Sequence, residues 1–172
     1  MKTNNKGYKL FESDKSGNLY PLFIDSRNIV PVGKWIPAEN HPTKGFAPRP
    51  GWHVGLIPDA PWLKKADGSY GSRRFKHGQR VWCEVEYLDE IDYQAEAEAT
   101  KKKCFTDRIP VNGCYVFREC GKGDWIISGG LKVVRILSED ERQEILKLMN
   151  YDESAAFEPY RQSFAKKGVA TC

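Results

Sequence analysis

Apolar and polar residues alternate most regularly between residues 80 and 87, and this alternation predicts a β-strand with one buried face. The face expected to enter the core carries Val81, Cys83, Val85 and Tyr87, and the opposite face carries Trp82, Glu84 and Glu86. No other segment of the chain shows a period of two residues over this length. We therefore expect the face of Val81, Cys83, Val85 and Tyr87 to enter the core.

Shorter alternating runs predict further strands. Residues 7–12 and 19–25 flank a turn-forming cluster and are expected to form a hairpin, whose second strand Pro21 either places at an edge or breaks at its start. Residues 34–39 form another short extended segment. Three runs bounded by glycine follow at 113–118, 125–128 and 131–137, and their spacing predicts a three-stranded meander.

Helical patterns are confined to three segments. Residues 92–102 combine strong helix formers with acids early and lysines late. Ser138 and Glu141 have the spacing of a capping box, which predicts a helix over 138–149. Phe157, Tyr160 and Phe164 have helical spacing in the C-terminal tail, where Pro159 is expected to break the helix or delay its start.

These patterns predict an α+β fold. We expect a twisted, mostly antiparallel sheet or a partly closed barrel of roughly six to eight short strands, with two or three peripheral helices. The 172 residues suit one domain, predicted to span residues 1–149, with a helical tail over residues 150–172 docked on it.

Composition narrows the function classes without choosing one. A formal net charge of +4 is too small to indicate nucleic-acid binding by itself, so any basic effect must be local. No apolar run approaches the roughly 20 residues needed to cross a bilayer, and residues 1–6 lack the apolar part of a signal peptide. We expect a cytoplasmic protein without a membrane partner.

The five cysteines do not match a disulfide or metal framework. They lie at Cys83, Cys104, Cys114, Cys120 and Cys172, an odd number without a Cys-x-x-Cys motif. Zinc held by Cys104, Cys114, Cys120 and a histidine stays open as an alternative, although the spacing is unlike common zinc frameworks. We expect reduced structural thiols and no metal.

A basic and aromatic stretch follows a predicted turn at Pro50 and Gly51. Its rings offer flat surfaces and its cations offer phosphate contacts, which together favour binding of a nucleic acid or of an acidic protein surface. The candidate binding residues are Arg49, Trp52, Trp62, Tyr70, Arg73, Arg74, Phe75, Lys76 and Arg80. The alternative for this stretch is a solvated charged loop.

A second hypothesis is catalytic and centres on His53. Histidine titrates in the range that suits proton transfer, and Glu84 and Glu86 could supply carboxylates if their face lined a pocket. The structural alternatives are a histidine that fixes the turn against the sheet and two glutamates that face water.

Several short motifs make the chain resemble an uncharacterised domain of bacteriophage and mobile-element proteins over about residues 7–146. The motifs are Tyr8–Phe11, Leu22–Asp25, Gly33–Ile36, Arg49–His53, Ala60–Pro61, Val81–Glu86 and Trp125–Gly129. This resemblance implies a phage-type context and carries no function. Inhibition of a host defence protein is a further binding function that suits such a context.

A shorter stretch is similar to the middle of ADP-ribosyltransferase-like domains. It comprises Gly51-Trp52-His53, Ala60 and the strand Val81–Val85. This similarity implies an NAD site at His53, with Glu84 or Glu86 as the later glutamate. The sequence departs from that pattern at Pro61, which disfavours the helix expected after Ala60. We therefore expect no cofactor for the binding module, and NAD for the enzyme.

Overall fold

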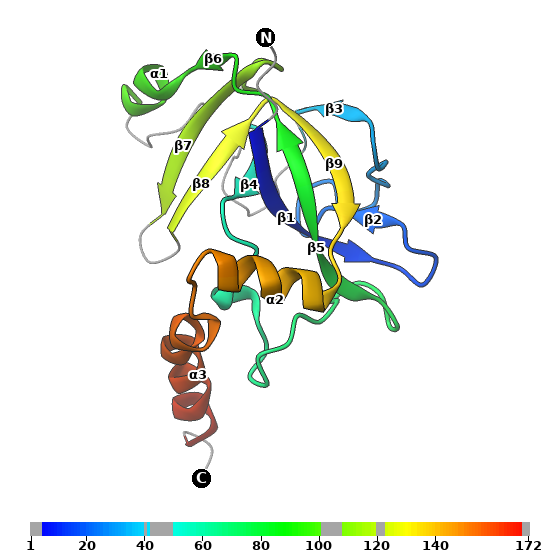
Figure 1. Ribbon diagram of the computed structural model, residues 1–172, viewed down its shortest axis with the longest axis vertical. Coiled ribbons are helices and arrows are strands. Elements are labelled where there is room, and N and C mark those ends of the chain that lie inside the picture. The colour runs from blue at the N-terminus through cyan, green and yellow to red at the C-terminus, as the bar shows by residue number, and fades with distance from the viewer. Residues whose placement is uncertain (1–4, 40, 42–49, 101–107, 120–122, 170–172) are drawn as a thin grey trace.

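A computed structural model describes residues 5–39, 41, 50–100, 108–119 and 123–169. It confirms the α+β class, with one nine-stranded sheet and three α-helices (Figure 1). The strands are β1 (Asn5–Ser13), β2 (Leu19–Tyr20), β3 (Trp35–Pro37), β4 (Trp52–Gly55), β5 (Gln79–Tyr87), β6 (Ile91–Asp92), β7 (Gly113–Glu119), β8 (Gly123–Ser128) and β9 (Gly130–Ile136). The helices are η1 (Pro61–Leu63, a 3-10 turn), α1 (Gln94–Glu98), α2 (Glu139–Leu148) and α3 (Glu153–Val169).

Strand β1 lies at the centre of the sheet, whose order is β3-β9-β5-β1-β4-β8-β7-β6. One edge of β1 pairs antiparallel with β5 along its whole length, from Asn5 opposite Tyr87 to Ser13 opposite Gln79. The other edge is shared, because Tyr8 pairs with Gly55 of β4 and Glu12 pairs with Tyr20 of β2. The sheet is therefore split where β4 leaves β1 and β2 takes its place.

The sheet curls strongly without closing into a barrel. Strands β8 and β9 are separated by β5, β1 and β4 in the sheet order, yet Gly129 alone joins them along the chain. They do not pair with each other in the described part of the sheet, because β8 pairs with β4 and β7 while β9 pairs with β5 and β3. Of the two forms expected from the sequence, the structure therefore has the twisted, mostly antiparallel sheet. The expected three-stranded meander is wrong, although β7 and β8 form its first hairpin.

Gly129 explains why the chain can turn so sharply there. A Cβ atom at this position would lie 1.8 Å from the carbonyl oxygen of Pro110, which no side chain allows. The Gly129 carbonyl accepts from the amide of Ala38, and its own amide donates to the carbonyl of Gly113. Glycine thus permits the close crossing that sends β9 to the opposite side of the sheet.

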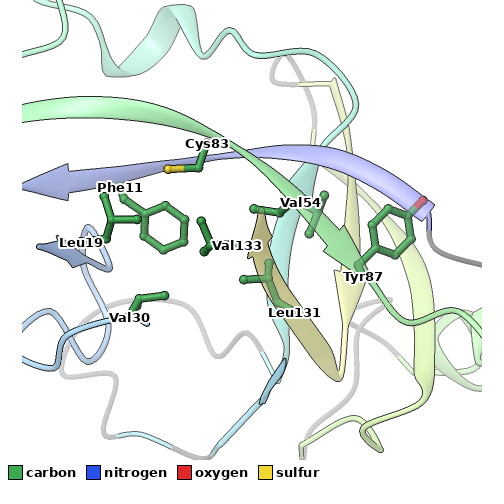
Figure 2. Packing of buried hydrophobic residues seen from close by; sticks show 9 residues of the cluster. Phe11, Leu19, Val30, Val54, Cys83, Tyr87, Leu131 and Val133 are labelled. Carbon is green, nitrogen blue, oxygen red and sulfur yellow. The ribbon is translucent and has the colours of Figure 1, made fainter. Parts of the chain in front are cut away.

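The main core lies on the face of the sheet that carries the predicted apolar side of β5 (Figure 2). Cys83, Val85 and Tyr87 are buried there as expected, together with Phe11 of β1 and Val133 of β9. The opposite face of β1 and β5 carries Leu10 and Trp82, which pack under the segment after β4 and against α2. A third cluster around Tyr115 and Ile127 lies over β7 and β8.

The three helices predicted from the sequence are present, but their lengths differ from the prediction. Helix α1 ends at Glu98, short of the predicted 92–102, and residues 101–107 lie outside the described part of the chain. Helix α2 begins as predicted, with both hydrogen bonds of the Ser138–Glu141 capping box present. Helix α3 runs through Pro159 without a break, which corrects the expected interruption. Pro159 is exposed, so water can hydrogen-bond the backbone carbonyl that its missing amide leaves unpaired. Figure 1 shows α3 running away from the sheet.

Candidate functional site

Residues 72–78, which we call the basic loop, carry the exposed part of the predicted binding surface. An isolated bridge between Gly71 and Gln79 closes the loop just before β5. Arg73, Arg74 and Lys76 are exposed, and Phe75 between them is half-buried. Three cations within four residues give this end of the molecule a concentrated positive charge.

A buried carboxylate anchors the basic loop. The Glu12 carboxylate accepts from the Ser72 hydroxyl and from the Arg73 amide, each at 3.0 Å. The Ser72 hydroxyl in turn accepts from the Phe75 amide at 3.0 Å. Glu12 and Arg80 are both buried, and their carboxylate and guanidinium lie 3.6 Å apart. The loop backbone is thus held on the sheet by hydrogen bonds to a charged group, which are stronger than neutral ones.

Arg74 is held by aromatic stacking. Its guanidinium lies 4.7 Å from the centroid of the Tyr20 ring and 4.8 Å from that of Phe75, and the two rings are 5.0 Å apart. The Tyr20 hydroxyl donates to Asp14 at 3.0 Å and so fixes its own ring. These contacts order an arginine that remains exposed to solvent.

The other predicted binding residues lie elsewhere. Arg80 is buried beneath the basic loop, with 1% of its side chain exposed. Tyr70 belongs to a buried ionic network described below, and Trp62 lies in a hollow beside α3, where its ring meets that of Trp125 at 5.5 Å. Trp52 is half-buried in the split of the sheet. Arg49 lies outside the described residues.

The ionic network, which we call the Asp59 network, joins the segment after β4 to α2 and α3. The Lys64 ammonium lies 2.8 Å from Asp59 and 2.6 Å from Glu153, and Arg142 donates to Glu153 at 2.7 Å. The Tyr70 and Tyr151 hydroxyls donate to Asp59, and its carboxylate raises the pKa of both beyond the effect of their burial. Burial alone raises the pKa of Glu153, but the hydrogen bonds from Lys64, Gln143 and Arg142 outweigh it and lower that pKa to about 2. This network fastens α3 to the body.

A cavity of about 150 Å³, which we call the Lys9 pocket, occupies the split between β1 and β4. The Lys9 ammonium donates to the carbonyl of His53 at 3.0 Å and lies 5.7 Å from the ring centroid of Trp52. Burial lowers the pKa of Lys9 from 10.5 to about 8. Sequence reasoning missed this site, because alternation in β1 places Lys9 on the side of Phe11 and opposite the apolar pair Tyr8 and Leu10.

The residues of the catalytic hypothesis are not brought together around a cavity. The centroid of the His53 ring lies 6.2 Å from that of the Trp125 ring. His53 is also one of the residues that line the Lys9 pocket, where its carbonyl accepts from Lys9. Glu84 is paired with Lys6 and Arg135, and Glu86 with Lys132. Strand β1 lies between the strands of His53 and of the two glutamates.

Metal-ligating side chains do not cluster in the described ranges, where no three His, Cys, Asp or Glu residues gather to hold an ion. Cys83 and Cys114 are free thiols, and burial raises the pKa of Cys83 to about 12. Cys104, Cys120 and Cys172 lie outside the described residues. Among the helices that the structure describes, none has both the length and the apolar character needed to span a bilayer.

Comparisons with protein-family models, curated proteins and solved structures find no match to this chain. The resemblances to a phage domain and to ADP-ribosyltransferase-like domains therefore stay predictions. The geometry of the candidate sites has to carry the functional argument.

Proposed function

We propose that the protein is a binding module that engages the phosphate backbone of a nucleic acid through the basic loop. The observation that carries the proposal is the stacked Arg74, which is ordered between Tyr20 and Phe75 and yet exposed, with Arg73 and Lys76 beside it. Arginine in a fixed orientation suits bidentate contact with phosphate oxygens.

Pre-organisation supports this proposal further. The loop backbone is anchored on Glu12, so little conformational entropy remains to be lost when the three cations meet a ligand. Tyr20 is buried and Phe75 half-buried, so ring surface for stacking bases is limited. We therefore expect binding dominated by phosphate contacts, with weak dependence on base sequence.

Fluorescence anisotropy with a labelled single-stranded oligonucleotide tests the proposal. Each neutralised phosphate on a single strand contributes about 0.7 to the slope of log affinity against log salt, so three cations predict roughly a twentyfold loss between about 50 and about 200 mM salt. The variant Arg73→Gln/Arg74→Gln/Lys76→Gln should lose that salt dependence and most of the affinity.

A matched control separates local contacts from net charge. The variant Arg161→Gln/Lys166→Gln/Lys167→Gln removes the same charge from exposed positions of α3 and should bind nearly as well as the wild type. If both variants lose oligonucleotide affinity equally, net charge alone explains the binding, and the role proposed for the basic loop is overturned. Salt-sensitive binding of polyglutamate, without oligonucleotide binding, would move the partner to an acidic protein surface.

A further inference from the structure

The Lys9 pocket places a cation on the core side of the sheet, and no acidic partner for it is found among the residues that the structure describes. Within the described residues, no carboxylate lies within ion-pair distance of the Lys9 ammonium, whose contacts are the His53 carbonyl and the rings of Phe11 and Trp52. Directly opposite on β5 is Cys83, a buried thiol. Lysine in such surroundings is usually paired, because desolvating its charge is costly.

The ammonium also has unused hydrogen-bonding capacity toward the described residues. It carries three N–H donors, and one of them is taken by the His53 carbonyl. The cavity beside it is lined mainly by apolar surface from Leu22, Phe23 and Trp52. A cavity of this size, about 150 Å³, can hold a ligand about as large as benzene.

Charged groups at the rim have their own partners or face water. Asp25 lies 3.6 Å from His41 and accepts from the Asn28 side chain at 2.6 Å. Glu39 is exposed to solvent. Among the described residues that line the pocket, the half-buried Lys9 ammonium is therefore the charge that a ligand would neutralise.

We propose that the Lys9 pocket binds a small organic carboxylate with an apolar body, whose carboxylate pairs with the Lys9 ammonium while its body packs against Trp52. Such a ligand would supply the missing counter-charge and fill the apolar space in one step. This site is separate from the basic loop, and it stands whether or not the protein binds nucleic acid.

Titration followed by amide chemical shifts tests the site with benzoate as the probe and benzamide as its uncharged counterpart. Benzoate should give saturable shifts in the segment 22–25 and at Trp52, and benzamide should bind at least about tenfold more weakly, because a charge-assisted hydrogen bond is lost. The Lys9→Met variant removes the charge, shortens the unbranched side chain by one atom and should lose benzoate affinity by a similar factor.

Lys6→Met is the matched control, because Lys6 lies on the same strand with an exposed side chain paired to Glu84. It should bind benzoate like the wild type. Equal binding of benzoate and benzamide by the wild type would overturn the proposal without recourse to any variant. Shifts confined to the basic loop would do the same, since benzoate would then report a surface cation.

Discussion

At the scale of single residues, Lys9 is expected to set part of the pH dependence of stability. Its pKa is about 8 in the folded protein and 10.5 when unfolded, so holding Lys9 charged in the folded protein lowers the free energy of unfolding. This loss is fully present below pH 8 and disappears as pH rises through 10.5. Lys9→Met should therefore raise the free energy of unfolding at neutral pH by about 1–3 kcal/mol. Urea unfolding of both proteins across this pH range measures the difference.

The difference between the variant and the wild type should shrink between pH 8 and pH 10.5, because the folded wild type has released the Lys9 proton there while the unfolded chain still binds it, so its stability rises with pH. Lys6→Met provides the comparison for the loss of an exposed lysine, with an expected change of about 0.5 kcal/mol or less. A Lys9→Met protein less stable than the wild type at pH 7 would contradict this account.

Residue patterns in the sequence predicted the burial of some side chains but not of others. The burial of Cys83, Val85 and Tyr87 follows directly from strict alternation in β5. The same rule applied to β1 gives apolar residues on both faces, Leu10 on one and Phe11 on the other, so it does not mark Lys9 as buried. The burial of Arg80 depends on Glu12, some 68 residues earlier, and local patterns do not encode such pairings.

At the scale of elements, the capping box of α2 should make a measurable contribution to the free energy of unfolding. The Ser138 hydroxyl accepts from the Glu141 amide, and the Glu141 carboxylate accepts from the Ser138 amide. Ser138→Ala should lower the free energy of unfolding by about 1 kcal/mol, which corresponds to about 2–4 °C in Tm for a chain of this size. Thermal unfolding followed by circular dichroism measures the shift.

Ser163→Ala is a suitable reference, since Ser163 lies inside α3, is exposed and donates to the Tyr160 carbonyl of its own helix. Alanine is the better helix former there, so the Tm should stay the same or rise slightly. A drop in Tm of equal size in both variants would mean that the cap itself adds nothing.

The attachment of α3 depends on Glu153 in the Asp59 network. Glu153→Gln keeps the shape but leaves Lys64 and Arg142 short of one negative charge, which should lower stability by about 3 kcal/mol at neutral pH. Because the folded pKa of Glu153 is about 2 against 4.5 when unfolded, this contribution is present above pH 4.5 and is lost as pH falls toward 2. Urea unfolding at neutral and acidic pH measures both effects.

Glu158→Gln tests whether any glutamate of α3 would have the same effect. Glu158 is exposed and pairs with Arg161 at 3.5 Å on the surface, so its replacement should change stability by about 0.5 kcal/mol or less. Similar losses in the two variants, or a Glu153→Gln loss that persists at pH 2, would refute the role given to the network.

At the scale of the whole molecule, the sequence predicted the class of fold and most strands, but not how they are ordered. Turn residues and alternation are local, so they located β1, β5, β7, β8 and α2. The path of β9 depends on the close approach of Gly129 to Pro110, two residues that sequence spacing does not connect. For the same reason the predicted binding residues divide among the basic loop, the Asp59 network and the Lys9 pocket.

The position of β1 at the centre of the sheet also affects how the protein folds during its synthesis on the ribosome. Its partner β5 begins at Gln79, which follows Ser13 by 66 positions, so at typical rates of synthesis β1 waits about 3–13 s for its longest pairing. During that interval the apolar side chains of β1 are uncovered. We expect Lys6, Lys9 and Glu12 to act then as gatekeeper charges, discouraging the waiting segment from pairing with a neighbouring nascent chain.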